Sequence, residues 1–160
     1  MDKVTIMSRQ KFLEWIPPVA KEQVVAIRIG DRAPVKDTAA KRYLATLALA
    51  FYDEWTFAED LDRNTPHGSN RLTNQDKIII DKFITQYADK HFVLHCEQGI
   101  SRSAAIGYYI LRRLGFTAEL NAKKQSCLYF PNIEVYGLLV GTPYTRATAT
   151  ALKKELNSLT

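Results

Sequence analysis

The chain has 160 residues, of which 46% are hydrophobic and 11% aromatic, a composition that excludes a disordered or low-complexity protein. This length predicts one globular domain that spans residues 1–160. The formal net charge is +5, but the basic residues are spread over many short clusters, so solvated helix faces are favoured over specific nucleic-acid binding.

The sequence contains no apolar run of the roughly 18 residues that a membrane span needs. The first residues, "MDKVTIMSRQKFLEW", lack the apolar stretch of a signal peptide. The two cysteines, Cys96 and Cys127, form neither a CxxC pair nor a disulfide framework. We therefore expect a soluble, cytoplasmic protein that makes no membrane contact.

The first third of the chain predicts three strands. Residues 3–7 ("KVTIM") form a short strand, and a helix from Ser8 to about Ile16 follows it. Residues 24–30 ("VVAIRIG") form the second strand, and 31–42 are polar and loop-like. In residues 43–53 ("YLATLALAFYD") large apolar side chains alternate with small ones, which indicates a third strand, although the many alanines would also suit a helix.

A long loop is predicted at residues 54–72, which are rich in turn formers. Thr73 then begins a helix, with Asp76 at the reciprocal position of a capping box. The apolar stripe of this helix comprises Ile79, Ile80, Phe83, Ile84 and Tyr87.

Residues 92–96 ("FVLHC") predict the next strand, and 103–114 a helix that is apolar almost all round and therefore buried. Gly115 stands where a C-terminal helix cap is expected. Two more helices are predicted within 131–140 and 147–157. Because strands alternate with helices, we predict an α/β fold: a single domain with a central, mostly parallel sheet of about four or five strands flanked by helices.

The segment between the strand 92–96 and the buried helix carries the chemistry. Open α/β sheets bind ligands beyond the carboxyl ends of their strands, and Cys96 lies at such an end. The tight turn can direct successive backbone N–H groups at an anion, and the helix N-terminus adds its own. Gly99 permits unusual backbone angles, and Arg102 offers a fork of donors that fits phosphate.

The same surroundings act on the thiol. At a helix N-terminus near an arginine, a cysteine pKa can fall from about 8.5 to roughly 3.5–7.5, which gives a thiolate at neutral pH. A thiolate in a site shaped for phosphate predicts nucleophilic attack on a phosphate monoester.

The motif "HCEQGISRS" (residues 95–103) resembles the His-Cys-x5-Arg-Ser/Thr signature of the cysteine-dependent protein tyrosine phosphatases, and the chain is similar in size to their dual-specificity branch. This resemblance implies that Cys96 is the nucleophile, that Arg102 binds the phosphoryl oxygens, and that Ser103 stabilises the departing thiolate. It implies a supporting role for His95. It also implies that the loop binds substrate through backbone amides, which belong to Glu97, Gln98, Gly99, Ile100 and Ser101. The resemblance extends over residues 43–140, and over 1–42 only by general pattern.

The family also uses an aspartate, on a loop after an earlier strand, as general acid. Asp53 ends the predicted strand 43–53 and is the preferred candidate, whereas Asp60 and Asp62 in the long loop are its competitors. Downstream, "YFPNIEVYGLL" is similar to a Pro-Asn segment that opens a late helix in the dual-specificity enzymes. That similarity implies that Asn132 supports the loop.

The expected substrate is a phosphorylated protein or peptide, hydrolysed by a monomer. The loop has no lysine of the kind that phosphoinositide phosphatases carry, so the resemblance implies phosphotyrosine, with phosphoserine and phosphothreonine as further substrates. A phosphate-binding module without catalysis and an RNA 5′-phosphatase remain as alternatives. No cofactor is expected, and no metal ion, because His91 and His95 would lie about 13 Å apart on one strand.

Overall fold

The centre of the molecule is a four-stranded sheet in which every strand pair is parallel. We describe it from a computed structural model that covers residues 1–32, 40–61 and 70–160. The strands are β1 (Val4–Ser8), β2 (Val24–Gly30), β3 (Thr46–Ala50) and β4 (His91–Cys96), and their order in the sheet is β1-β4-β2-β3. The predicted α/β class and parallel sheet are confirmed.

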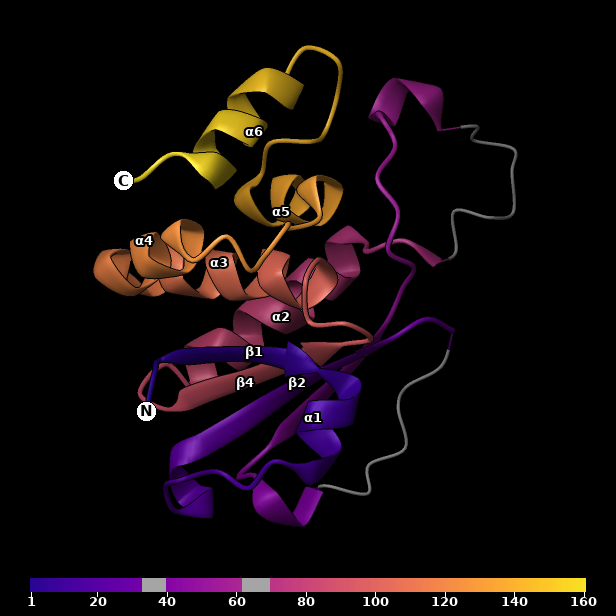
Figure 1. Cartoon of the computed structure of the whole chain (residues 1–160). Helices are drawn as coiled ribbons and strands as arrows, with labels where there is room; N and C mark the ends of the chain where they lie inside the picture. Colours follow the sequence, from indigo (N-terminus) through magenta and orange to yellow (C-terminus); the bar gives the residue numbers. More distant parts are fainter. Residues whose placement is uncertain (33–39, 62–69) are drawn as a thin grey trace.

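Helices cover both faces of this sheet. One face carries α1 (Arg9–Glu14), and the other carries the longer helices (Figure 1). These are α2 (Asn74–Gln86), α3 (Arg102–Leu114), α4 (Thr117–Gln125), α5 (Ile133–Val140) and α6 (Ala149–Asn157). Single 3-10 turns lie at Lys21–Gln23, Ala40–Arg42 and Ala58–Asp60. In the described part of the chain, none of the helices is long and apolar enough to pass through a membrane.

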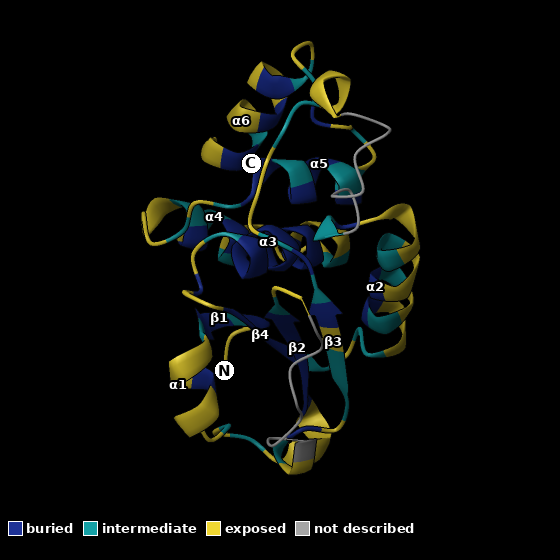
Figure 2. Cartoon of the chain, turned by 90° about the vertical axis from the view of Figure 1, so that its right-hand side faces the viewer, coloured by how far each residue is buried: buried dark blue, intermediate teal, exposed yellow. Residues whose placement is uncertain are grey.

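The central strands are buried on both sides, as a parallel sheet with two covered faces requires (Figure 2). Side chains alternate along β4: Phe92, Leu94 and Cys96 join the larger core on the α3 side. Val93 and His95 face the opposite side, where they pack with Phe12 of α1. The last residue of β4 therefore directs its thiol toward the helix that follows it.

Helix α3 is the most deeply buried helix of those described, with every residue from Arg102 to Leu111 inside the protein. It ends at Gly115, whose left-handed φ of 79° accommodates the cap. The capping box at Thr73 and Asp76 and the two late helices are likewise present. The predictions for these elements are confirmed.

The third strand is shorter than predicted, since β3 covers 46–50 and not 43–53. Its partner β2 ends at Gly30, whose carbonyl accepts the Phe51 N–H at 3.0 Å. Beyond that point β2 offers the chain no further residue to pair with, so Asp53 lies after the strand and does not end it. Two other details differ: α4 was not predicted, and Ile79 is 44% exposed and lies outside the buried stripe of α2.

Candidate active site

The loop 97–101 joins β4 to α3, and three of its carbonyl groups are bound from outside. Glu97 O accepts from Arg9 N at 3.1 Å, Ile100 O from Phe130 N at 2.9 Å, and Ser101 O from Asn132 N at 3.1 Å. In a trans peptide the N–H points away from the carbonyl of the same unit. The N–H groups that follow these three carbonyls are therefore turned toward the inside of the loop, where an anion can accept from them.

Gly99 allows the loop to pass close against the end of β1. Its φ is +73°, and a Cβ atom at this position would lie 2.4 Å from the backbone carbonyl carbon of Met7. Both the angle and the contact exclude a side chain. The sequence indicated the conformational need for glycine here, but not the neighbour, because Met7 belongs to a strand that is distant in sequence.

The Cys96 thiol is buried, with 3% of the residue exposed. Its Sγ lies 3.1 Å from Ser103 Oγ and accepts the Gly99 N–H at 3.3 Å. Burial raises the pKa of Cys96, but the hydrogen bonds from the Ser103 hydroxyl and from the backbone of Ser103, Gly99 and Ser101 outweigh it and lower the pKa below its ordinary value. The site thus favours a thiolate.

His95 supports this loop as a neutral imidazole. Its Nε2 lies 3.0 Å from Arg28 Nε and its Nδ1 lies 3.1 Å from the Cys96 carbonyl oxygen. Arginine only donates, so Nε2 is the acceptor, and Nδ1 carries the proton that it donates to Cys96 O. Burial, reinforced by the nearby charges of Arg28, Arg9 and Arg102, lowers the pKa of His95 to about 4.

Arg28 was not among the predicted site residues. It is 1% exposed, and its guanidinium lies 4.9 Å from the centre of the Phe12 ring. The signal in the sequence was an arginine inside the otherwise apolar strand "VVAIRIG". Because β2 lies next to β4, this arginine comes to lie beside His95.

Arg102 is held by the ends of two other strands. Its Nη1 donates to Asp31 Oδ1 at 2.6 Å and to Phe51 O at 2.7 Å, just beyond β2 and β3. Its Nε is buried and has no hydrogen-bond partner among the described residues. A buried donor without an acceptor is costly, so this nitrogen fits a site that an anion completes.

Asp53 lies across the loop from Cys96. Its Oδ1 accepts from Ser101 Oγ at 2.7 Å and from Asn132 Nδ2 at 2.9 Å. Asn132 is 1% exposed; its Nδ2 also donates to Glu54 O, and its Oδ1 caps α5 by accepting from Val135 N. Since the Ser101 hydroxyl is engaged by Asp53, it does not cap α3. Apart from the Ser103 N–H, which binds the Cys96 sulfur, the first N–H groups of that helix are left for a ligand.

One hollow of about 350 Å³, here called the cysteine hollow, brings the predicted residues together. Its lining includes Cys96 and Arg102 on one side and Asp53 on the other. The remaining lining residues are Trp55, Glu97, Gln98, Ile100, Ser101 and Phe130. Phe130 is the lining residue that the sequence had not indicated.

Of the two competing aspartates, Asp60 does not line the cysteine hollow. Asp60 is bound through both carboxylate oxygens to Arg146, at 2.9 and 2.6 Å. Asp62 lies outside the described residues. Cys127 is exposed and does not line the hollow. Within the described residues, no group of three or more His, Cys, Asp or Glu side chains could hold a metal ion.

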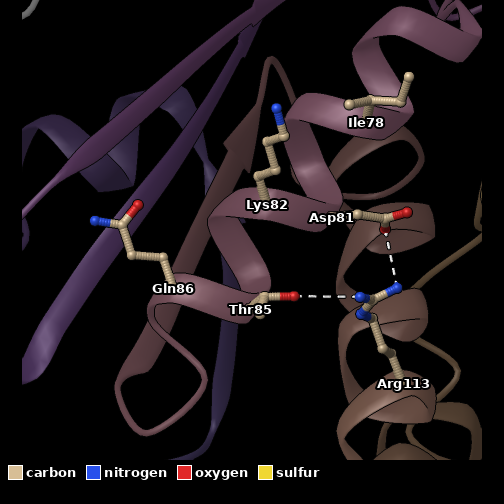
Figure 3. Close-up of a pocket in the computed structure, with 6 residues that line it drawn as sticks. All are labelled: Ile78, Asp81, Lys82, Thr85, Gln86 and Arg113. Carbon is tan, nitrogen blue, oxygen red and sulfur yellow. Dashed lines mark hydrogen bonds and ion pairs between the residues drawn. The ribbon is translucent and has the colours of Figure 1, made fainter.

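A wider groove of about 510 Å³ lies between α2 and α3 (Figure 3). Its main charged groups bind one another, because Arg113 lies 3.3 Å from Asp81 and donates to Thr85 at 3.2 Å. Its lining contains none of the residues that the sequence predicted for the site.

Fold and site together define an α/β protein with a buried thiolate-favouring cysteine at the carboxyl end of a central parallel strand. No family model matches the chain, and no curated protein matches it. Among solved structures, the chain is similar to the crystal structure of human DUSP28, with 14% sequence identity and a TM-score of 0.46. The alignment covers 97% of this chain and 96% of that chain.

Proposed function

We propose that the protein is a phosphatase of the cysteine-dependent tyrosine and dual-specificity type, which hydrolyses phosphate monoesters in phosphorylated proteins. Phosphotyrosine is the main substrate, and phosphoserine and phosphothreonine are further ones. One observation supports this most: the Cys96 sulfur accepts hydrogen bonds at the mouth of α3 and shares one hollow with Arg102 and Asp53.

In the first step the Cys96 thiolate attacks phosphorus. Its electron pair forms the S–P bond, and the P–O bond to the alcohol breaks with its pair moving to the leaving oxygen. That oxygen takes a proton from the Asp53 carboxyl group. The loop N–H groups and the Arg102 guanidinium bind the phosphoryl oxygens, whose charge they stabilise in the transition state.

In the second step water attacks the phosphocysteine. The carboxylate of Asp53 accepts a proton from the water, the P–S bond breaks, and inorganic phosphate is released. The sulfur leaves as a thiolate, which is stabilised by the Ser103 hydroxyl, whose Oγ lies 3.1 Å from Sγ. No cofactor enters this mechanism.

The rim of the cysteine hollow favours an aromatic phosphate ester. Trp55 and Phe130 are 55% and 74% exposed, and Ile100 is 37% exposed. These side chains offer apolar surface to a phenyl ring, whereas serine and threonine esters gain less from it. The first loop residue is the acidic Glu97, and the loop carries no lysine that would meet a second phosphate.

The test begins with p-nitrophenyl phosphate and the Cys96→Ser variant. We expect Cys96→Ser to abolish turnover while vanadate or phosphate still binds, because the loop N–H groups remain. Cys127→Ser is the matched control and is expected to keep wild-type activity, since Cys127 is exposed and outside the hollow. Retained turnover in Cys96→Ser would refute the mechanism.

Asp53→Ala tests the general acid. Loss of general acid catalysis lowers rates by roughly 10²–10⁴, and the loss is greatest for phosphotyrosine peptides and smaller for p-nitrophenyl phosphate, whose leaving group needs less protonation. Asp60→Ala is the control. A wild-type rate on phosphotyrosine peptides in Asp53→Ala would rule Asp53 out as the acid.

Two alternatives would give different results. A phosphate-binding module would bind phosphopeptides without turning them over, and an RNA 5′-phosphatase would prefer a 5′-phosphorylated oligonucleotide to any phosphopeptide.

A further inference from the structure

A second hollow of about 250 Å³ opens beside the cysteine hollow, here called the apolar hollow. Its walls come from the segment before α5 and from α6. Ile133 and Leu156 form part of its lining, and Lys153 and Asn157 are its polar members. The mechanism proposed above gives these residues no role.

The two hollows share a wall. Trp55 and Phe130 line both of them. These are large aromatic side chains that are 55% and 74% exposed, and exposed aromatic surface beside a hollow is typical of a binding site. A ligand that occupies the cysteine hollow can therefore continue past these rings into the apolar hollow.

Hydrogen bonds tie the backbone beside both aromatic residues to neighbouring parts of the site. Phe130 N donates to Ile100 O at 2.9 Å. On either side of Trp55, Glu54 O accepts from Asn132 and Thr56 N donates to Glu134 Oε1 at 2.8 Å. The backbone of the shared wall is thus tied to the cysteine loop and to the start of α5.

The positive charge of Lys153 adds a second requirement for a ligand of the apolar hollow. Lys153 lines the apolar hollow and forms no ion pair among the described residues. In contrast, Arg71, Arg112 and Arg146 are each paired with a carboxylate. An ammonium group at the edge of an apolar hollow favours a ligand that carries an acidic group next to an apolar one.

We propose that the apolar hollow binds the substrate segment that flanks the phosphorylated residue, and that it selects an apolar side chain with an acidic residue beside it. This inference rests on the proposed phosphatase function. The preferred substrates are thus phosphotyrosine peptides in which a residue such as leucine and a glutamate or aspartate lie close to the phosphotyrosine.

The first experiment is a set of phosphotyrosine peptides with leucine or alanine at each flanking position. We expect leucine at one position to raise kcat/KM about tenfold over alanine, the lower range of discrimination by an apolar pocket. In Phe130→Ala this preference should disappear. The combined change in enzyme and peptide should then cost no more than either change alone, which is the non-additivity of groups in contact.

The second experiment tests the charge. Lys153→Glu should lower kcat/KM for an acidic peptide about tenfold relative to that for p-nitrophenyl phosphate, which is too small to reach the apolar hollow. Lys82→Glu is the matched control, because Lys82 is an exposed lysine in the groove between α2 and α3. This control variant should leave the ratio of the two substrates unchanged.

The possible outcomes distinguish failure of this inference from failure of the proposed phosphatase function. If p-nitrophenyl phosphate and phosphopeptides are hydrolysed but no flanking leucine changes kcat/KM, the inference is overturned and the phosphatase function stands. If neither substrate is hydrolysed, or a 5′-phosphorylated oligonucleotide is preferred, both fail. A wild-type dimer that Phe130→Ala dissociates would show that a second copy of the chain covers this surface, which also overturns the inference.

Discussion

Ionisation of Cys96 depends on a few hydrogen bonds that act against burial. The thiol is almost enclosed, and enclosure alone would keep it protonated. The Ser103 hydroxyl is the first of the groups that reverse this effect, ahead of the backbone N–H groups. The Ser103 hydroxyl, on the first turn of α3, is therefore the largest single contribution to ionisation of the nucleophile, and three backbone N–H groups add to it.

Ser103→Ala should raise the pKa of Cys96, because burial remains and the strongest opposing hydrogen bond is lost. The rate of alkylation by iodoacetamide reports the thiolate, and at mildly acidic pH we expect it to fall about tenfold, the equivalent of one hydrogen bond to a charged group. The Cys127→Ser background restricts the reaction to Cys96. An unchanged pH profile of alkylation would mean that the backbone amides alone determine the pKa.

At this scale the sequence predicted the residues that lie within one continuous motif. Cys96, Arg102 and Ser103 are local, and their spacing alone places them around one loop. Arg28 and Asp31 could not be predicted, since their contacts with His95 and Arg102 depend on β2 being the neighbour of β4. Strand order is decided by the packing of the whole sheet, so it cannot be predicted from any short segment of the sequence.

At the scale of elements, the cysteine loop takes its shape from β1. The strand ends at Ser8, which is paired with Cys96, and Gly99 passes directly over Met7. Two separate constraints act on this glycine: its positive φ and the nearby backbone of Met7. The two constraints can be measured separately, since Gly115 has a φ of +79° and a Cβ atom added there would meet nothing within 4 Å.

Gly115→Ala should lower the free energy of unfolding by about 1–2 kcal/mol, the cost of a left-handed conformation for an L-residue. Gly99→Ala should cost about 1–3 kcal/mol more, because backbone atoms 2.4 Å away must also move. Urea unfolding of the two variants measures the difference. The proposed phosphatase activity should fall in Gly99→Ala and not in Gly115→Ala. Equal stability losses in the two variants would show that the contact with Met7 relaxes freely.

Most elements could be predicted because their signals are local: the capping box at Thr73, the apolar strand before Cys96 and the glycine after α3. The end of β3 could not, because it is set by the last residue of β2 and not by the apolar pattern, which continues to Phe51. Helix α4 was missed because its surface is mostly polar, and of its residues only Leu120 and Lys123 are buried.

At the scale of the whole molecule, two apolar cores lie on opposite faces of the sheet, and the second one encloses polar groups. His95 is fully buried there beside Arg28 and Phe12. A protonated imidazole in this place would meet the Arg28 guanidinium without solvent around it. The folded protein therefore favours the neutral form of His95.

This preference for the neutral imidazole makes the stability of the protein depend on pH. The folded-state pKa of His95 is about 4, below the usual 6.5, so between these values the unfolded chain binds a proton that the folded protein does not. The free energy of unfolding should decrease as the pH falls from about 6.5 to about 4, by an amount on the order of 3 kcal/mol. Urea unfolding across this range measures the decrease.

His95→Gln is the control for this prediction. It keeps a polar side chain without a titrating imidazole, so its stability should vary less over the same pH range than that of the wild type. If both proteins lose stability in parallel, the carboxyl groups and not His95 are responsible for the pH dependence.

The hydrogen bonds from Phe130 and Asn132 to the cysteine loop make the shape of the site depend on residues outside the signature motif. The signature ends at Ser103, yet two of the three outer supports of its carbonyl groups come from residues about 30 positions later in the chain. A truncated polypeptide that stopped after α4 would retain β1 to β4 and the complete signature and still lack both supports. The motif therefore depends on residues outside it. If it is grafted onto another scaffold without the segment that precedes α5, we expect the cysteine to be present but not reactive.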